Sequence, residues 1–286
     1  MNMTDLGVST GSRRPTTDLT VAVVIPCHNY GHFLPEALES VRGQSLPADT
    51  VLVVDDSSTD DTRSVVERYS GEVGYLRIDS GSPSAARNAG ARAVDTDLVV
   101  FLDADDRIET SFLERCIEAM PEDWTHHFVY THFRRFGRSD AVHTAPAYDR
   151  TELARENYIG PTTLLPRAEV VRNGYDESLR IGLEDWDLYL TLAEEGIEGV
   201  LVDEPLHLYR IHGDGVTVRL RRRPLRLATL RLRLVIKHRQ LYTASLAAWR
   251  VKNIIIMLCT DTEERYQLLG RSRRLGRLAK DLARRR

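Results

Sequence analysis

A short apolar run that ends in a cluster of aspartates is the feature of this sequence that most restricts its fold. Residues 99–102 are all hydrophobic, and Asp103, Asp105 and Asp106 follow within four positions. A hydrophobic run of this length is typical of a buried strand in a parallel sheet. Open α/β sheets bind ligands outside the carboxyl ends of their strands, so we expect these acids to lie at a ligand site.

The Asp-x-Asp pattern has two interpretations when it is taken alone. Neighbouring carboxylates repel one another unless a cation or hydrogen-bond donors compensate their charge, which favours a hard divalent metal and, through it, a phosphate. The alternative is an acidic turn in which Asp106 or Thr110 caps the next helix.

The first hundred residues alternate between predicted strands and predicted helices. Strands are expected at 19–26, 50–54, 75–78 and 99–102, and helices at 33–44, 62–69 and 85–93. This alternation implies right-handed crossovers and an α/β fold with a mostly parallel sheet flanked by helices. Asp55 and Asp56 follow the second strand and should therefore lie at the same sheet edge as Asp103 and Asp105.

Several protein classes are disfavoured by what the sequence lacks. No Gly-x-Gly-x-x-Gly follows the first strand and no Gly-x-x-x-x-Gly-Lys-Ser/Thr occurs, which disfavours typical dinucleotide-binding and P-loop proteins. Cys27, Cys116 and Cys259 lack metal-ligand spacing and give no disulfide framework, which favours a cytoplasmic protein. The most apolar stretch, 241–259, is interrupted by Arg250 and Lys252 and is not expected to span a membrane.

Four motifs, in this order and spacing, make the sequence similar to family 2 glycosyltransferases. They are Ile25–Asn29, Val53–Asp60, Ala86–Gly90 and Phe101–Asp106. The resemblance covers about residues 20–217. It implies a GT-A fold, a nucleotide-sugar donor, a divalent cation and inversion at the anomeric carbon. It also implies a nucleotide-sugar-binding half at 19–107 and an acceptor-binding half of the same catalytic domain at 108–218, after a disordered N-terminus at 1–18.

The resemblance also assigns roles around the nucleotide. Residues after the first strand match positions that line the nucleobase pocket: Pro26, His28 and Asn29. Asp56 matches the acid that accepts a hydrogen bond from the base, and a uracil or thymine imide is a suitable donor. Asp55 either faces the ribose or supports the turn. Arg87 either contacts the diphosphate or pairs with these two acids, and His28 has the alternative of a solvent-facing loop residue.

Three residues are implied as the metal site. Asp103 matches the family position near the ribose and the metal, and Asp105 matches the principal metal ligand. His212, in Tyr209-Arg210-Ile211-His212, matches a histidine that approaches the metal or the diphosphate. Mg²⁺ or Mn²⁺ suits such oxygen-rich ligands. The competing interpretation of His212 is a surface residue at the end of a strand.

A Glu-Asp pair opens a predicted helix that runs to about Glu195. Sugar transfer needs a group that takes the proton of the acceptor hydroxyl as that hydroxyl attacks. The resemblance implies Asp185 as this general base, with Glu184 supporting it. The alternative is that both acids only complement the dipole at the helix N-terminus.

The charge of the chain is divided very unevenly. Residues 1–218 contain 19 Arg and 38 acidic residues, whereas residues 219–286 contain 20 basic and 4 acidic residues. We expect a basic helical extension over 219–286, with helices at 225–241, 241–259 and 263–283. It could complete the fold or form a homo-oligomer, make peripheral contact with an anionic membrane, or bind nucleic acid. No nucleic-acid recognition fold supports the last option, and no nucleic-acid partner is expected.

These features together predict a metal-dependent, inverting transferase that uses a UDP- or dTDP-sugar. The Gln-x-x-Arg-Trp motif of processive family members is absent, so a single addition is expected. The acceptor could be a cell-wall or other glycan, a lipid-linked intermediate or a small molecule such as a natural product. The alternatives are a nucleotide-sugar-binding protein without catalysis and a sugar-1-phosphate nucleotidyltransferase. The latter normally carries a Gly-rich loop with Arg, where this chain has Pro26–Gly31.

Overall fold

The structure, a computed structural model, describes residues 18–180, 182–212 and 223–259. Of the disordered N-terminus expected at 1–18, residues 1–17 lie outside the described residues, as does the helix expected at 263–283. Within the described residues, no helix is both long and apolar enough to cross a membrane.

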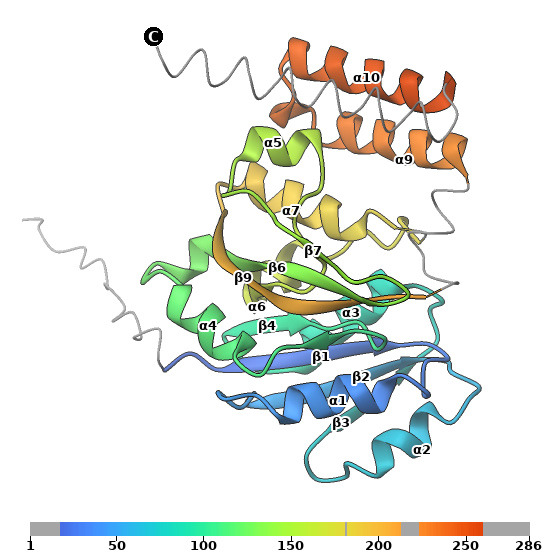
Figure 1. The fold of residues 1–286 in the computed structure, drawn as a ribbon, viewed down its shortest axis with the longest axis vertical. Helices are drawn as coiled ribbons and strands as arrows, with labels where there is room; N and C mark the ends of the chain where they lie inside the picture. The colour runs from blue at the N-terminus through green and yellow to red at the C-terminus, as the bar shows by residue number, and fades with distance from the viewer. Residues whose placement is uncertain (1–17, 181, 213–222, 260–286) are drawn as a thin grey trace, which may run out of the picture.

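One sheet runs through the described part of the chain (Figure 1). Its nine strands are β1 (Val21–Cys27), β2 (Thr50–Asp56), β3 (Gly74–Ile78), β4 (Leu98–Phe101), β5 (Arg107–Ile108), β6 (His127–Gly137), β7 (Ala141–His143), β8 (Leu164–Pro166) and β9 (Glu198–Ile211). Their order is β3-β2-β1-β4-β8-β6-β9-β5, and β7 pairs with β6.

The sheet has a parallel half and a mixed half. Strands β3, β2, β1 and β4 are all parallel, as the alternation in the sequence predicted. Beyond β4 the pairs β4–β8, β8–β6 and β9–β5 are antiparallel, whereas β6 and β9 are parallel. The predicted α/β fold is therefore confirmed; the sheet is mixed, with parallel pairs in the first half and the antiparallel pairs concentrated in the second half.

Helices cover both faces of this sheet. They are α1 (Leu34–Arg42), α2 (Thr62–Glu67), α3 (Pro83–Ala93), α4 (Phe112–Ala119), α5 (Arg150–Arg155), α6 (Arg167–Asn173), α7 (Glu184–Glu194), α9 (Pro224–Lys237) and α10 (Ala244–Cys259), with short 3₁₀ turns at Trp124–His126 and Arg239–Leu241. Helices α1, α2 and α4 share one apolar core with the sheet, and α3, α5, α6 and α7 share the other.

Strand β1 explains why both faces need helices. Val23 and Ile25 point into the core with α1, whereas Ala22 and Val24 point into the core with α3. Because side chains alternate along a strand, a continuous apolar run is stable only when both faces are covered.

The predicted helical extension is present in its described part. Leu230 and Leu234 of α9 join the core that contains α7, and Ala228 packs against Ile254 of α10. His238, directly after α9, is buried between Asp187 and Glu194 of α7, with each N–O distance 2.9 Å. The extension is thus attached to the helix that begins with Glu184 and Asp185.

The close approach of α3 to the sheet depends on Gly90. A Cβ atom at this position would lie 2.3 Å from Cγ1 of Val24 and 3.1 Å from Cγ2 of Val54. Only a residue without a side chain allows α3 to lie this near to β1 and β2. The same helix carries Arg87 one turn earlier, so this contact sets the position of the Arg87 guanidinium.

We predict that Gly90→Ala lowers the free energy of unfolding by about 1–3 kcal/mol, because the added methyl group overpacks the core. Urea unfolding followed by circular dichroism measures the change. The control is Gly43→Ala, at a position with φ −82° whose nearest contact would be 3.3 Å away. Equal stability of Gly90→Ala and the wild type would contradict this account of α3.

Candidate functional site

The acidic turn after β4 is fixed in place by Asp106. Its side chain is 1% exposed, and its Oδ1 accepts a hydrogen bond from the backbone N–H of Arg210 at 2.7 Å. Its Oδ2 lies 2.8 Å from Nε2 of His207. Burial raises the pKa of Asp106 to about 7. Asp106 therefore ties the turn to β9.

The suggested capping role of Asp106 or Thr110 is wrong. Ser111 occupies the N-cap position of α4, and no side chain caps that helix. Asp106 contacts β9 instead, whereas Asp103 and Asp105 lie at the sheet edge and do not take part in that contact.

Asp105 contacts His212 at the end of β9. Oδ2 of Asp105 lies 2.8 Å from Nε2 of His212, and both side chains are largely but not fully buried. Burial, followed by repulsion from Asp103, raises the pKa of Asp105, and the hydrogen bond from His212 partly offsets this. The sequence placed these three residues at one site, and the structure brings Asp105 and His212 into direct contact.

The residues expected to bind a metal provide only part of a coordination shell. The described residues contain no group of three or more His, Cys, Asp or Glu side chains placed to hold an ion. Asp103 is instead engaged by Arg87. Asp105 and His212 supply one carboxylate and one imidazole, which suit a divalent cation whose other ligands are phosphate oxygens and water.

Arg87 is the central cation of the site. Its guanidinium donates to Oδ1 of Asp103 at 2.6 Å and to Oε1 of Glu184 at 2.9 Å, and it is 4% exposed. Burial lowers its pKa, but Asp103 and Glu184 outweigh this and raise the pKa well above its usual value. The guanidinium also lies 5.4 Å from the ring centre of Tyr175. Arg87 thus joins the turn after β4 to the start of α7.

Asp185 lies in the first turn of α7, where the helix dipole favours an anion. Its Oδ1 accepts from the backbone N–H of Trp186 at 2.7 Å, and its Oδ2 accepts from Nδ2 of Asn157 at 3.1 Å. Burial, together with the charge of Glu184, raises the pKa of Asp185 to about 7. A carboxyl group with such a pKa can take up a proton near neutral pH and release it again.

The acids after β2 support their own loops. Asp55 accepts hydrogen bonds from the backbone N–H of Ser58, from the Tyr75 hydroxyl and from Arg77. These three hydrogen bonds together lower the pKa of Asp55 despite its burial. The cationic partner of Asp55 is therefore Arg77, so the suggested pairing of Arg87 with the acids after β2 is wrong.

Asp56 is also fully used within the fold. Its two oxygens accept four hydrogen bonds, from the backbone N–H groups of Ser80, Gly81 and Ser82 and from the Ser80 hydroxyl. A carboxylate has about four accepting positions. This geometry favours a structural role, fixing the loop before α3, over the predicted contact with a nucleobase.

The loop after β1 presents a histidine ring. Nδ1 of His28 donates to the carbonyl oxygen of Asp56 at 2.5 Å, so Nε2 is the accepting nitrogen toward the amide of Asn29 in the neutral ring. His28 is exposed, and Pro26 before it is partly exposed. Asn29 accepts from the backbone N–H and hydroxyl of Thr59, which joins this loop to the one after β2.

Backbone strain is concentrated around these loops. In the described ranges, the non-glycine residues with positive φ are Asn29 at 58°, Ser57 at 59° and Leu183 at 71°. Two lie in the loops after β1 and β2, and Leu183 directly precedes Glu184. Such conformations cost free energy and cluster at functional sites, so they support placing the site at this edge.

Several contacts at the site carried no signal in the sequence. Asn157 lies in a loop outside the recognised motifs, and only the fold brings it to Asp185. Tyr175 lies in the segment 173–177, which resembles the family less specifically, and nothing in that segment indicated its contact with Arg87. His207 could have been suspected because it precedes the segment that ends at His212, but nothing indicated that its partner would be Asp106.

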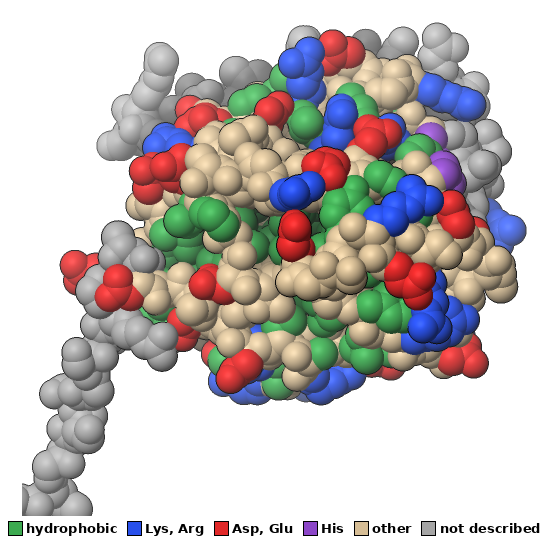
Figure 2. Space-filling view, turned by 90° about the horizontal axis from the view of Figure 1, so that it is seen from below, with side chains coloured by type: hydrophobic (Ala, Val, Ile, Leu, Met, Phe, Trp, Pro, Cys, Tyr) green, Lys and Arg blue, Asp and Glu red, His purple; other side chains and the backbone are tan. Residues whose placement is uncertain are grey.

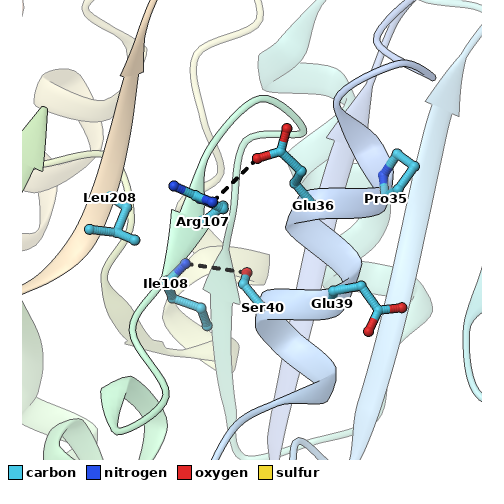
Figure 3. A pocket seen from close by; sticks show the side chains of 7 residues that line it. All are labelled: Pro35, Glu36, Glu39, Ser40, Arg107, Ile108 and Leu208. Carbon is cyan, nitrogen blue, oxygen red and sulfur yellow. Dashed lines mark hydrogen bonds and ion pairs between the residues drawn. The ribbon is translucent and has the colours of Figure 1, made fainter. Parts of the chain in front are cut away.

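A surface cleft of about 490 Å³ lies behind the acidic turn, between α1, β5 and β9 (Figure 3). It is lined by Pro35, Glu36, Glu39, Ser40, Arg107, Ile108 and Leu208, none of which is a predicted site residue. Glu36 pairs with Arg107 and with Arg210, and Nε of Arg210 donates to the Asp105 carbonyl oxygen at 2.6 Å. The cleft therefore borders the structural support of the turn, not the edge where Asp103 and Asp185 lie.

The fold and this edge define an α/β protein with acids from several strands and a buried arginine among them. The model of the family described as glycosyl transferase family 2 matches residues 22–174. The chain belongs to this family, and its class is glycosyltransferase.

Known proteins agree with this assignment. A Bacillus subtilis (strain 168) protein named for teichuronic acid biosynthesis, the glycosyltransferase TuaG, is 26% identical over 69% of this chain and 81% of its own length. Escherichia coli chondroitin synthase is 28% identical over 62% of this chain, which spans only 27% of that enzyme.

Solved structures share the fold. Staphylococcus aureus TarS 1–349 has a TM-score of 0.63 with 20% identity, over 88% of this chain and 78% of that one. Its complex with UDP-GlcNAc has a TM-score of 0.60 with 21% identity, over 70% of this chain and 61% of that one. These matches confirm the predicted GT-A-type architecture.

We predict that Arg87→Met lowers the free energy of unfolding by about 3 kcal/mol or more, because Asp103 and Glu184 lose a buried cationic partner. Adding Glu184→Gln should recover part of the loss in a double-mutant cycle. The matched control is Arg63→Met, which breaks an exposed ion pair with Glu67 and should cost at most about 1 kcal/mol. Equal costs for the two arginines in urea unfolding would contradict the bridging role of Arg87.

Proposed function

We propose that this protein transfers a sugar from a UDP- or dTDP-sugar to an acceptor hydroxyl, with inversion, with a divalent cation and by single additions. One observation carries the proposal, namely the contact of Arg87 with both Asp103 and Glu184. Asp103 is expected at the donor, and Glu184 directly precedes the expected base, Asp185. The two acids share Arg87 as their ion-pair partner. The donor and the acceptor would therefore meet at this edge of the sheet. Residues 19–107 would bind the donor, and residues 108–218 would bind the acceptor.

Asp185 is our candidate for the general base. Its pKa of about 7 allows a substantial ionised fraction at neutral pH, and an ionised carboxylate accepts the proton of an attacking hydroxyl. Asn157 donates to one of its oxygens and thereby fixes the orientation of the carboxyl group. Glu184 is held by Arg87 and acts as a positioning residue that also keeps the pKa of Asp185 high.

Asp105 and His212 are our candidates for cation ligands, with Asp103 near the ribose. A bound divalent cation would neutralise charge on the departing nucleoside diphosphate. The pKa of Asp105 is raised by burial and by repulsion from Asp103, and a bound cation would stabilise its ionised form. His28 and Pro26 are our candidates for contact with the nucleobase, since an exposed imidazole ring is flat enough to stack on a pyrimidine.

The names of two relatives suggest a class of acceptor for the proposed reaction. TuaG is named for teichuronic acid biosynthesis, TarS is named a poly(ribitol-phosphate) β-N-acetylglucosaminyltransferase, and both names refer to polymers. We therefore propose a polysaccharide or cell-wall glycan as acceptor ahead of a small molecule.

We predict that Asp185→Asn reduces turnover by about a hundred- to ten-thousand-fold while the affinity for UDP stays nearly unchanged. In the wild type, kcat/KM should fall about tenfold per pH unit below pH 7, because Asp185 becomes protonated. UDP release from the donor is the readout, with isothermal titration for UDP affinity.

The folded-state pKa of Asp185 is raised, so its ionised form destabilises the fold as the pH increases. The Asp185→Asn protein should therefore be at least as stable as the wild type at pH 8, which separates lost catalysis from unfolding. Normal turnover by a folded Asp185→Asn variant would remove Asp185 as the base.

We predict that UDP or dTDP raises the Tm of the wild type more with Mn²⁺ than without it, since a ligand that binds only the native state stabilises it. Asp105→Asn should abolish the part that depends on Mn²⁺. Glu118→Gln, which changes an exposed carboxylate on α4, should leave that part intact. A Tm unaffected by every nucleoside diphosphate tested would contradict the proposed function.

A further inference from the structure

The outer surface of α9 carries an apolar stripe that has no partner in the described structure. Leu225, Leu232 and Ile236 are 73%, 43% and 65% exposed. Their spacing of seven and four residues places them on one side of the helix. The opposite side holds Leu234, which packs into the core beside α7. The stripe is therefore additional to the contacts that attach α9 to the rest of the protein.

Helix α10 carries a second stripe with matching spacing. Val251 and Ile255 are 43% and 53% exposed, and the exposed Ala244 and Ala248 precede them on the same side of the helix. Leu246 faces the core instead. Five of the eight large apolar side chains that are exposed in the described residues thus belong to these two helices.

The two stripes form one surface. The helices lie side by side at the end of the molecule that is farthest from β3 (Figure 1). Ala228 and Ile254 pack against each other between the helices. Ala228 lies one helical turn before Leu232 and Ile254 lies one turn after Val251, so each stripe borders this contact. We call the surface made by Leu225, Leu232, Ile236, Val251 and Ile255 the outer face.

The helices that carry the outer face have basic side chains and no acidic ones over residues 223–259. Residues 223–259 contain eight Arg and Lys and no Asp or Glu. Arg226, Arg239 and Lys252 are exposed. At the opposite end of the molecule, by contrast, acidic and basic side chains are interspersed (Figure 2). Exposed apolar side chains bordered by cations only are typical of helices that lie on an anionic membrane surface.

Helix α9 is attached to the main body by ion pairs on its inner side. Besides the His238 contacts, Nζ of Lys237 lies 2.8 Å from Asp187 and 3.1 Å from Asp176. None of these contacts uses a residue of the outer face, so docking of the outer face leaves them in place.

We propose that the outer face of α9 and α10 docks on an anionic lipid bilayer, with the five apolar side chains in the interfacial region and the exposed cations at lipid phosphates. A second copy of the chain is the weaker occupant, because a two-fold contact would place cations of the same face against one another. This proposal is independent of the proposed sugar transfer.

The test is co-sedimentation of the full chain with vesicles of phosphatidylcholine alone and of phosphatidylcholine with phosphatidylglycerol. The wild type should bind the anionic vesicles and bind neutral ones much more weakly. The double variant Ile236→Glu/Ile255→Glu should lower the partition coefficient on anionic vesicles by roughly tenfold or more, since it removes two apolar contacts and adds two negative charges.

The matched control is Val142→Glu/Val171→Glu, which introduces the same two charges at exposed apolar positions on β7 and α6. It should bind vesicles better than the outer-face variant, and all three proteins should have the same far-UV spectrum. Equal loss in both double variants would mean that only net charge matters and would overturn the proposal.

Two other results would also overturn it. Unchanged binding of Ile236→Glu/Ile255→Glu would assign any vesicle contact to another part of the chain. Absence of wild-type binding to anionic vesicles, with a dimer in sedimentation velocity that the same variant converts to a monomer, would assign the outer face to a second copy.

Discussion

One buried guanidinium joins three separate segments of the candidate site. Arg87 comes from α3, Asp103 from the turn after β4 and Glu184 from the start of α7. Without the cation, the two partly buried carboxylates would repel each other, and neither carboxylate has another cationic partner among the described ion pairs. The position of Arg87 rests in turn on the close packing of α3 that Gly90 permits. A glycine at the contact between α3 and the sheet thus determines where the Arg87 guanidinium lies.

The acids at this edge are distinguished by how each is compensated. Asp55 accepts three hydrogen bonds and Asp56 accepts four, and both have lowered pKa values, which favours a structural role for these two anions. Asp105 and Asp185 have fewer donors, and burial raises their pKa values. The first pair stabilises the loops after β2 and before α3, whereas the charge of the second pair is less fully compensated by donors within the fold.

The predictability of the structure differs between its two halves. The strands β1, β2 and β4 are continuous apolar runs, so their parallel arrangement could be predicted from sequence. Strands β5 and β8 have two and three residues, too short to give any periodic pattern. Motifs placed the relevant acids near one another, but they could not show which donors each acid receives. The saturation of Asp56 depends on backbone N–H groups of residues 80–82, and backbone donors have no sequence signature.

The C-terminal helices contact α7, the helix that carries the candidate base. Asp187, which accepts from Lys237 and contacts His238, lies only two residues after Asp185 on α7. Breaking these contacts would leave the buried Asp187 carboxylate without its described partners, which is destabilising, so the contacts of Lys237 and His238 stabilise the start of α7. In the described part of the extension, basic residues therefore have two kinds of position. Arg233, Lys237 and His238 contact acids of α7 and of the loop before it, whereas Arg226, Arg239 and Lys252 are exposed.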